Sequence, residues 1–151
     1  MRQQNIQQDS MHKMDILMWR IFKLFLKNKK QILERLNLTC SQFEILSAIQ
    51  HLLNVKSEVI QVDLAEKTSI DPMTTSTVLR NLQKKGLITR YRSLVNTRTV
   101  TVKLTSDGTE ILEKAYQELN TFSELIYKDI NKKQLTMQLV KLFDKLNKLN
   151  Y

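Results

Sequence analysis

Glycine, proline and cysteine are scarce in this sequence, whose 151 residues include two glycines, one proline and one cysteine. Glycine and proline most often interrupt helices and strands, so their scarcity predicts a mainly helical chain in which each one marks a boundary. The single cysteine, Cys40, excludes an intramolecular disulfide framework and is typical of a reducing compartment. At this length we expect one domain with one hydrophobic core.

Acidic residues are missing from a long central stretch, since no Asp or Glu occurs between Asp71 and Asp107. The whole chain has a formal net charge of +9. A carboxylate facing phosphate groups would cancel much of the benefit of a nearby cation, so this stretch predicts contact with an anionic partner. Seven basic side chains lie within it, at Arg80, Lys84, Lys85, Arg90, Arg92, Arg98 and Lys103.

Long apolar runs are missing as well. The most apolar segment, "MDILMWRIFKLFLK", is interrupted by Arg20 and Lys23 and is shorter than the roughly 20 residues that cross a bilayer. We therefore expect a soluble, cytoplasmic protein. Binding to a membrane surface needs a large apolar helix face opposite the charges. Because much of the charge here falls on a predicted hairpin, nucleic acid is favoured over a membrane as the partner.

The sequence also lacks the patterns that catalysis and metal binding require. It has no glycine-rich phosphate loop, no pairing of a nucleophile with a base and no cluster of carboxylates. His12 and His51 have no acidic or thiol companions at the spacing of metal ligands. We predict no enzymatic activity, no cofactor and no metal site.

Apolar side chains recur every three or four residues over most of the chain, which predicts amphipathic helices. The first should run from about Ser10 to Leu36 and kink or fray near "KNKK". The polar N-terminal segment "MRQQNIQQDS" should fray. A second should follow Thr39, which forms a capping box with Gln42, and end near Asn54.

The middle of the chain has the order of a helix-turn-helix motif. "VDLAEKTSI" predicts a short helix and then a turn. Asp71 and Pro72 mark the start of the next helix as its N-cap and first residue, and Gly86 is placed to end it in a left-handed conformation.

A β hairpin is predicted directly after this motif. "LITRYR" and "RTVTVKLT" alternate like two strands, and the two sides of the second carry Val100, Val102 and Leu104 on one and Thr99, Thr101 and Lys103 on the other. The connection "SLVNT" has no glycine, so we expect a longer, mobile loop rather than a two-residue turn. A helix of roughly 20 residues, capped by Thr105 or Ser106, and a last helix of about residues 132–150 should follow.

The helix after Pro72 and the hairpin beside it provide the candidate DNA contacts. Val78, Leu79 and Leu82 should face the core, which leaves hydroxyl, amide and basic groups for base edges in the major groove. The hairpin arginines could reach phosphates or the minor groove, where guanidinium is favoured. The candidate DNA-binding residues are Thr74, Thr75, Ser76, Arg80, Asn81, Lys84, Arg90, Arg92 and Arg98.

These segments resemble the multiple antibiotic resistance regulator (MarR) family of winged-helix transcription factors. The resemblance is carried by "LTCSQFEIL", "DLAEKTSIDPMTTSTVLRNLQKKGLITR" and "NTRTVTVKLTSDG", which together span residues 38–108. It implies a homodimer joined through the terminal helices, a pseudo-palindromic site in double-stranded DNA, and often a ligand or redox signal that releases the DNA. It also implies that Thr74, Ser76 and Arg98 occupy positions of family DNA contacts.

The sequence departs from the family pattern at two positions. Asn96 stands where the family usually has Asp two residues before the wing arginine, so a carboxylate that would orient Arg98 is missing and a looser wing is expected. Thr77 stands where the family often has Arg or Lys, which removes one expected phosphate contact. Arg80 is the candidate replacement.

Two features have both a regulatory and a structural interpretation. Cys40 is a candidate redox sensor because a helix N-terminus favours the reactive thiolate. Relatives that sense oxidation through a lone cysteine carry it on the first helix, however, whereas Cys40 should begin the second, which favours a structural role. A pocket for a small aromatic effector is the other feature, although aromatic residues at helical spacing more often fill a core. Its candidate residues are Trp19, Phe22, Phe43 and Phe122.

The sequence thus predicts a mainly α protein with a winged helix-turn-helix, about six helices and a two-stranded β wing. We expect a single MarR-like domain over residues 1–151, with a DNA-binding core at 38–108 and dimerisation helices at 10–37 and 109–151. The expected function is sequence-specific DNA binding as a dimeric transcriptional repressor that a small effector releases. The alternative is a protein–protein interaction module whose basic face docks an acidic partner. A redox or effector-hydrolysing enzyme is a third, disfavoured hypothesis.

Overall fold

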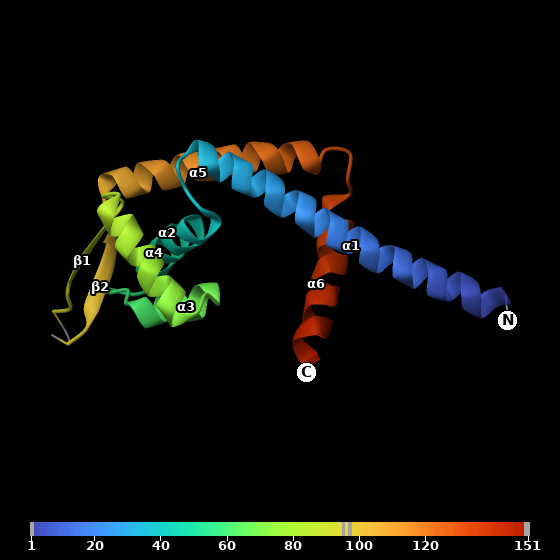
Figure 1. The fold of residues 1–151 in the computed structure, drawn as a ribbon, viewed down its shortest axis with the longest axis horizontal. Coiled ribbons are helices and arrows are strands. Elements are labelled where there is room, and N and C mark those ends of the chain that lie inside the picture. The colour runs from blue at the N-terminus through green and yellow to red at the C-terminus, as the bar shows by residue number, and fades with distance from the viewer. Residues whose placement is uncertain (1, 95, 97, 150–151) are drawn as a thin grey trace. The chain divides into compact units, whose positions relative to one another are not determined.

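Figure 1 shows the computed structural model of the chain, which describes residues 2–94, 96 and 98–149, with the backbone alone for 2–12. Within these residues it forms six α-helices and one antiparallel two-stranded sheet, which confirms the predicted fold class. The chain divides into two compact units, Met1–Tyr116 and Gln117–Tyr151. The elements are α1 (Arg2–Arg35), α2 (Cys40–Leu53), α3 (Gln61–Thr68), α4 (Pro72–Lys84), β1 (Ile88–Arg92), β2 (Val100–Leu104), α5 (Ser106–Ile126) and α6 (Lys132–Lys148).

The start of α2 is fixed by the predicted capping box. The backbone N–H of Gln42 donates to the Thr39 hydroxyl, and the backbone N–H of Thr39 donates to the Gln42 side-chain oxygen, each over 3.1 Å. These two bonds satisfy donors that a helix N-terminus otherwise leaves without partners. Asn54 caps the other end of the helix, as predicted.

The ends of α4 also follow the sequence signals. Asp71 is its N-cap and accepts the Thr74 N–H over 2.9 Å, with Pro72 in the first turn. Gly86 has a φ of +73°, a left-handed conformation that favours glycine. The N–H groups of Gly86 and Leu87 donate back to the carbonyls of Gln83 and Leu82, which completes a Schellman motif.

The second glycine, Gly108, is required by close packing rather than by backbone conformation. A Cβ atom at this position would lie 1.9 Å from the backbone oxygen of Leu87. The first turn of α5 can therefore approach the end of α4 only because position 108 carries no side chain. Thr105, one of the two N-caps that the sequence predicted, caps this turn by accepting the Gly108 N–H over 3.0 Å.

The hydrophobic core lies within Met1–Tyr116, among α2, α3, α4 and the hairpin, which Figure 1 shows grouped together. The predicted inner residues of α4, Val78, Leu79 and Leu82, are buried. They share the interior with side chains from each neighbouring element, including Ile45, Leu46, Ile49, Val59, Leu64, Ile88, Val102 and Leu112.

Both faces of β2 contribute a buried residue. Val102 is buried, Thr101 on the opposite face is fully buried too, and the Thr101 hydroxyl donates to the backbone oxygen of Tyr91 over 3.3 Å. Ile60 forms an isolated antiparallel bridge to Thr101, and the Val59 carbonyl accepts the Val102 N–H. The segment before α3 thus lies beside β2 and covers the face that carries Thr101.

Helix α1 is longer and more regular than predicted. It begins at Arg2 and continues without a break to Arg35, so the expected fraying was wrong for residues 2–10, and the helix is not interrupted near residues 27–30. Asn28 occupies the predicted kink, and its side-chain amide donates to the Leu24 carbonyl one turn earlier. Four consecutive polar residues, "KNKK", do not interrupt a helix because none of them is a breaker.

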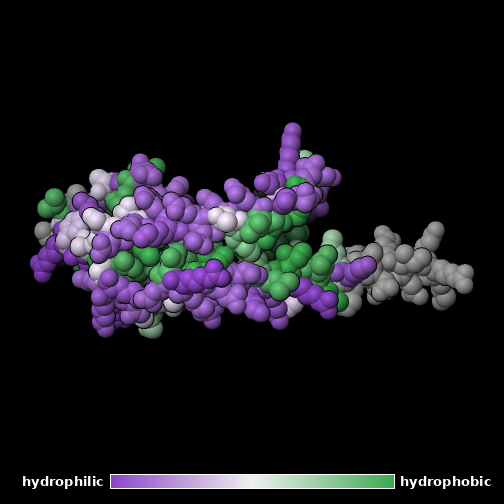
Figure 2. Space-filling view, turned by 90° about the horizontal axis from the view of Figure 1, so that it is seen from above, coloured by the Kyte–Doolittle hydropathy of each residue, from purple (hydrophilic) through white to green (hydrophobic). Residues whose placement is uncertain are grey.

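The apolar faces of α1 and α6 are largely open to solvent. Among the described side chains of α1 only Ile32 and Leu33 are buried, whereas Trp19 is 59% exposed. The described part of α6 has no buried residue, and Phe143 is 64% exposed. In the space-filling view of Figure 2, hydrophobic residues lie at the molecular surface. Within the described residues, no helix is long and apolar enough to span a bilayer.

Candidate nucleic-acid interface

The helix-turn-helix consists of α3, a short turn and α4. The turn opens at Ser69, which has a φ of +56°. The Thr68 hydroxyl bonds to the Leu64 carbonyl over 2.7 Å and accepts the Ile70 N–H over 3.4 Å, so it supports both the end of α3 and the turn. The Asp71 cap then starts α4. The relation between the two helices is therefore fixed by hydrogen bonds within the turn as well as by packing.

The outer face of α4 is polar and cationic. Thr77, Arg80 and Lys84 repeat every three or four residues on the side opposite the buried stripe, and all three are exposed. An Arg80 Nη2 donates to the Thr77 hydroxyl over 3.3 Å. The predicted residues Thr74 and Asn81 are exposed at the edges of this face, and Ser76 is half-buried. Met73 was not singled out from the sequence, yet it is 80% exposed on the first turn of α4.

Thr75 is not part of this face, so its selection as a candidate DNA contact was wrong. The residue is 0% exposed, and its hydroxyl donates to the Ile70 carbonyl over 3.2 Å. Thr75 precedes Val78 and Leu79 by three and four residues, which places all three on one side of the helix. Its hydroxyl therefore ties α4 to the preceding turn.

The hairpin contributes three arginines that differ in environment. Arg92 and Arg98 are exposed, while Arg90 is half-buried. Arg90 and Arg98 line one cavity of about 370 Å³, together with Gln61 at the start of α3. The Nε of Arg90 is buried and has no hydrogen-bond partner within the described residues. The fold thus brings together two cations that are eight residues apart in the sequence.

The loop between the strands, which carries Arg98, is held by a residue that sequence reasoning missed. The Ser93 hydroxyl and the Leu94 N–H both donate to the carboxylate of Glu58, over 2.5 and 3.1 Å. Asn96 accepts the Arg98 N–H through its side-chain oxygen over 3.1 Å. Glu58 lies 35 residues before Ser93, and no local sequence pattern signals this pairing.

The acid-free stretch of sequence is not acid-free in space. Besides Glu58 at the wing, Asp71 lies at the N-terminus of α4, where hydrogen bonds from Thr74 hold the pKa of its carboxyl below the ordinary value of 3.8. Burial raises the pKa of Asp63, but bonds from Lys56 and from the Ile60 N–H outweigh it and lower that pKa. Each carboxylate is thus already bonded to the protein's own donors.

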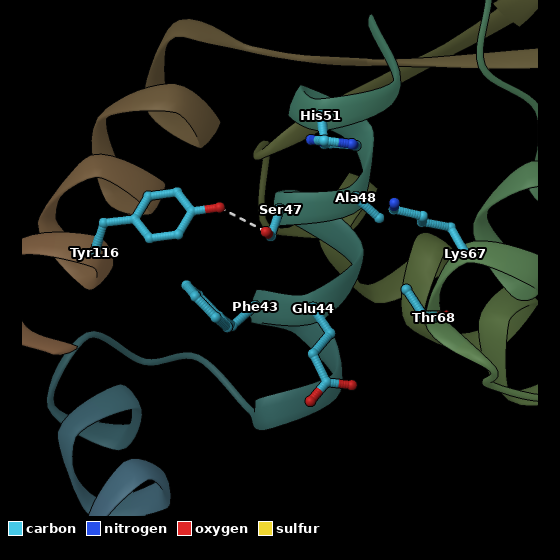
Figure 3. Close-up of a pocket in the computed structure, with 8 residues that line it drawn as sticks. All are labelled: Phe43, Glu44, Ser47, Ala48, His51, Lys67, Thr68 and Tyr116. Carbon is cyan, nitrogen blue, oxygen red and sulfur yellow. Dashed lines mark hydrogen bonds between the residues drawn. The ribbon is translucent and has the colours of Figure 1, made fainter. Parts of the chain in front are cut away.

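A separate pocket of about 530 Å³ lies between α2, the end of α3 and α5 (Figure 3). The Tyr116 hydroxyl lies 2.5 Å from the Ser47 hydroxyl, and the Phe43 and Tyr116 rings meet edge to face at 5.4 Å. Figure 3 shows His51 from α2 and Lys67 from α3 on the same pocket. Its wall also includes Glu44, Ala48 and Thr68.

The other regulatory candidates lie elsewhere. Of the four predicted effector residues, Phe43 lines this pocket, whereas Trp19 and Phe22 are exposed on α1 and Phe122 belongs to the unit Gln117–Tyr151. Cys40 is half-buried at the first residue of α2. Across the described residues no three His, Cys, Asp or Glu side chains lie close enough together to hold a metal ion.

Comparison with known proteins identifies the family. The family model described as "MarR family" matches residues 38–100, which contain α2 to β1 and the wing loop. A helix-turn-helix transcriptional regulator of Bacillus cereus (strain ATCC 10987 / NRS 248) is 30% identical over 118 residues, which cover 78% of this chain and 76% of the relative. The chain belongs to the MarR family.

A second relative and two solved structures extend the comparison. The organic hydroperoxide resistance transcriptional regulator of Bacillus subtilis (strain 168) is 36% identical over 90 residues, or 59% of this chain and 58% of the relative. The structure of Staphylococcus aureus MepR in complex with DNA has a TM-score of 0.75 at 22% identity and covers 89% of this chain and 94% of MepR.

The structure of Bordetella bronchiseptica BpsR, whose DNA binding is regulated by 6-hydroxynicotinic acid, has a TM-score of 0.74 at 22% identity. It covers 90% of this chain and 94% of BpsR. At this level of identity the two structures establish the MarR-type winged-helix fold of this chain. The family itself is one of transcriptional regulators.

Proposed function

We propose that this MarR-family chain is a dimeric, sequence-specific DNA-binding repressor of transcription whose release from DNA is controlled by a small molecule. The observation that carries the proposal is the outer face of α4, where Thr77, Arg80 and Lys84 are exposed opposite a buried apolar stripe and beside the cationic wing. The proposal includes no catalytic step, and the protein would act in the compartment that holds the chromosome.

Each part of the surface has a distinct role in this proposal. α4 would enter the major groove, where Arg80 and Asn81 can reach base edges through hydrogen bonds. The exposed Arg98 of the wing would reach the adjoining minor groove or its phosphates. Arg90 and Arg92 would add phosphate contacts. The similarity in fold to MepR, which has been solved with DNA, supports this arrangement.

Dimerisation would be provided by the helices outside residues 38–108. Phe22 on α1 and Leu146 on α6 are 50% and 55% exposed, and they belong to stripes that also include Leu17, Ile21, Leu139 and Phe143. Apolar faces of this extent are rarely left open to water in a monomer. A twofold dimer would present two α4 helices to successive major grooves about 34 Å apart, which corresponds to a pseudo-palindromic operator.

The pocket around Phe43 is our candidate effector site. Phe43 and Tyr116 offer aromatic surfaces, and His51 and Lys67 offer polar groups that could pair with an acidic substituent. One wall leads directly to the helix-turn-helix, because Thr68 bonds to the Ile70 N–H and Thr75 bonds to the Ile70 carbonyl. A ligand that moves Thr68 would therefore change the placement of α4 relative to α3.

The test of DNA binding is selection of bound sequences from random double-stranded DNA, followed by anisotropy titration of the enriched site. We expect a symmetric sequence, nanomolar-range affinity and a steep loss of affinity as salt rises. Equal binding to heparin, random DNA and the enriched site would overturn the proposal and favour the alternative of a basic docking face for an acidic protein.

The test of the effector site uses the resulting protein–DNA complex. BpsR responds to 6-hydroxynicotinic acid, so this compound is a suitable first probe, followed by a panel of aromatic acids. A compound that releases the DNA from the wild type should lose its effect in the Tyr116→Ala variant, which retains DNA binding. A compound that is equally effective on both proteins would place the effector site elsewhere.

A further inference from the structure

The wing of this protein is anchored by a carboxylate from outside the helix-turn-helix and the hairpin. Both oxygens of Glu58 are engaged: Oε2 accepts the Ser93 hydroxyl and Oε1 accepts the Leu94 N–H. Ser93 is 4% exposed, whereas Leu94 is 92% exposed, so these bonds lie where the loop leaves the interior. Glu58 is itself held in place, since the next residue, Val59, is buried and pairs with β2 through the Val102 N–H.

The hydrogen bonds continue from Glu58 to the backbone of Arg98. The Ser93 oxygen that donates to Glu58 accepts the Asn96 N–H over 3.0 Å, and the Asn96 side-chain oxygen accepts the Arg98 N–H over 3.1 Å. The Thr99 N–H donates to the Asn96 carbonyl over 2.8 Å. The backbone position of Arg98 is therefore linked to Glu58 through two residues of the loop.

We propose that Glu58 is the positioning residue of the wing, and that its carboxylate fixes the loop conformation in which Arg98 meets DNA. This inference rests on the proposed DNA-binding function. Position 96 carries a neutral Asn, whose side-chain oxygen accepts the Arg98 N–H. Glu58 supplies the loop with the charged acceptor that position 96 does not provide. Charged acceptors form stronger hydrogen bonds than neutral ones.

Charge alone and positioning predict opposite effects for removal of Glu58. A carboxylate close to DNA repels phosphates, so its loss would strengthen binding if charge dominated. Loss of the two hydrogen bonds would free the loop, and the bound conformation of Arg98 would then be populated only part of the time, which weakens apparent affinity. The direction of the change in affinity therefore decides between the two effects.

The first measurement uses the free protein and needs no DNA. Amide hydrogen exchange at Leu94, read by NMR, should be at least tenfold faster in Glu58→Ala than in the wild type. Glu58→Gln should restore much of the protection, because the amide can accept the Leu94 N–H and donate to Ser93. The matched control is Glu66→Ala, which removes a carboxylate that is exposed on α3 and has no hydrogen bond or ion pair within the described part of the chain.

The second measurement is affinity for the selected operator as a function of salt. Glu58→Ala should bind the operator about fivefold more weakly than the wild type does, and this loss of affinity should not exceed the loss caused by Arg98→Ala. The salt dependence of its affinity should fall toward that of Arg98→Ala. Glu58→Gln should stay within about twofold of the wild type, because its bonds to the loop are retained. Glu66→Ala should bind as well as the wild type or slightly better, because only charge changes.

The outcomes separate this inference from the proposed function. If Leu94 exchanges at the wild-type rate in Glu58→Ala, or if Glu58→Ala binds DNA like Glu66→Ala, Glu58 does not position the wing. If the wild type shows no preference among DNA sequences, the proposed function fails, while the exchange measurement still decides whether Glu58 holds the loop.

Discussion

The winged core, residues 38–108, and the terminal helices, α1 and α6, use similar apolar residues in different ways. Leu79 and Leu82 in the core are 0% exposed, whereas Leu17 on α1 and Leu146 on α6 are each 55% exposed. The core closes because α2, α3, α4 and the hairpin enclose one another's apolar faces. The terminal helices have equally clear stripes that stay open within a single chain. Amphipathic periodicity therefore indicates that a helix has an apolar face to be covered, but it does not indicate which element covers that face.

The largest expected effect tests the buried interior of the winged core. Leu79→Ala should lower the free energy of unfolding by about 3 kcal/mol, because it leaves a cavity in a fully packed interior. The same substitution at Leu94, which is 92% exposed, should change it by less than about 0.5 kcal/mol. Urea unfolding followed by circular dichroism measures both, and equal effects would show that the core is not packed as described.

The next largest effect tests the exposed apolar faces of the terminal helices. Phe143→Asp should raise the dissociation constant of the proposed dimer about 100-fold, because a charge replaces an apolar anchor. Sedimentation velocity at several concentrations measures it. Lys141→Asp adds a carboxylate about 160° around the same helix and should leave the dimer intact. A chain that remains dimeric in both variants would exclude α6 as the dimer contact.

Within the winged core, the wing cation Arg98 should contribute only to DNA binding. Arg98→Ala should weaken operator binding about tenfold near 0.15 M salt and reduce the slope of log affinity against log salt by about 0.9, because roughly one phosphate contact is lost. Arg35→Ala, an equal charge change at the end of α1, is the control and should alter the slope far less. Indistinguishable slopes for the two variants would remove the wing from the interface.

A smaller effect separates the two faces of α4. Thr75→Val keeps the side-chain shape but removes the bond to the Ile70 carbonyl, so we expect a loss of about 1 kcal/mol in stability and no change in the ranking of DNA sites. Arg80→Ala should do the reverse, because Arg80 is exposed on the outer face. A changed preference among DNA sites in Thr75→Val, measured by competition binding, would show that Thr75 does take part in DNA recognition.

The smallest effect concerns pH at the start of α4. The folded pKa of Asp71 is lowered by its bonds from Thr74, so its stabilising contribution is present above the ordinary value of 3.8 and is lost as pH falls through the lower folded pKa. Asp71→Asn keeps a capping oxygen that does not titrate. The wild type should therefore lose stability relative to this variant on acidification below pH 3.8. A difference in unfolding midpoint that stays constant across this range would contradict the assignment.

Local signals were the most accurate part of the sequence-based prediction. The Thr39 capping box, the Asp71 and Pro72 helix start and the Gly86 helix end were all confirmed, because each depends on residues within a few positions of one another. Thr75 failed for a different reason. Its hydroxyl satisfies a buried carbonyl, and polarity alone does not distinguish a hydroxyl that faces DNA from one that faces the turn.

Contacts between distant segments could not be predicted in this way. Glu58 was not singled out because its partners at Ser93 and Leu94 follow 35 and 36 residues later. Strand alternation placed Thr101 on the side opposite Val102, but it does not reveal that Ile60 pairs beside Thr101. The meeting of Arg90 and Arg98 in one cavity likewise depends on how the hairpin folds back on itself.

The sequence by itself determined where the helices begin and end, which stripe of α4 is apolar and that the region after Pro72 is cationic. These properties depend on backbone preferences, capping and side-chain periodicity, which act over one or two turns of chain. Only the tertiary structure decided which hydroxyls are available to a partner and which carboxylate holds the wing. Those outcomes depend on segments that meet only when the chain folds, and on the requirement that buried polar groups find hydrogen-bond partners there.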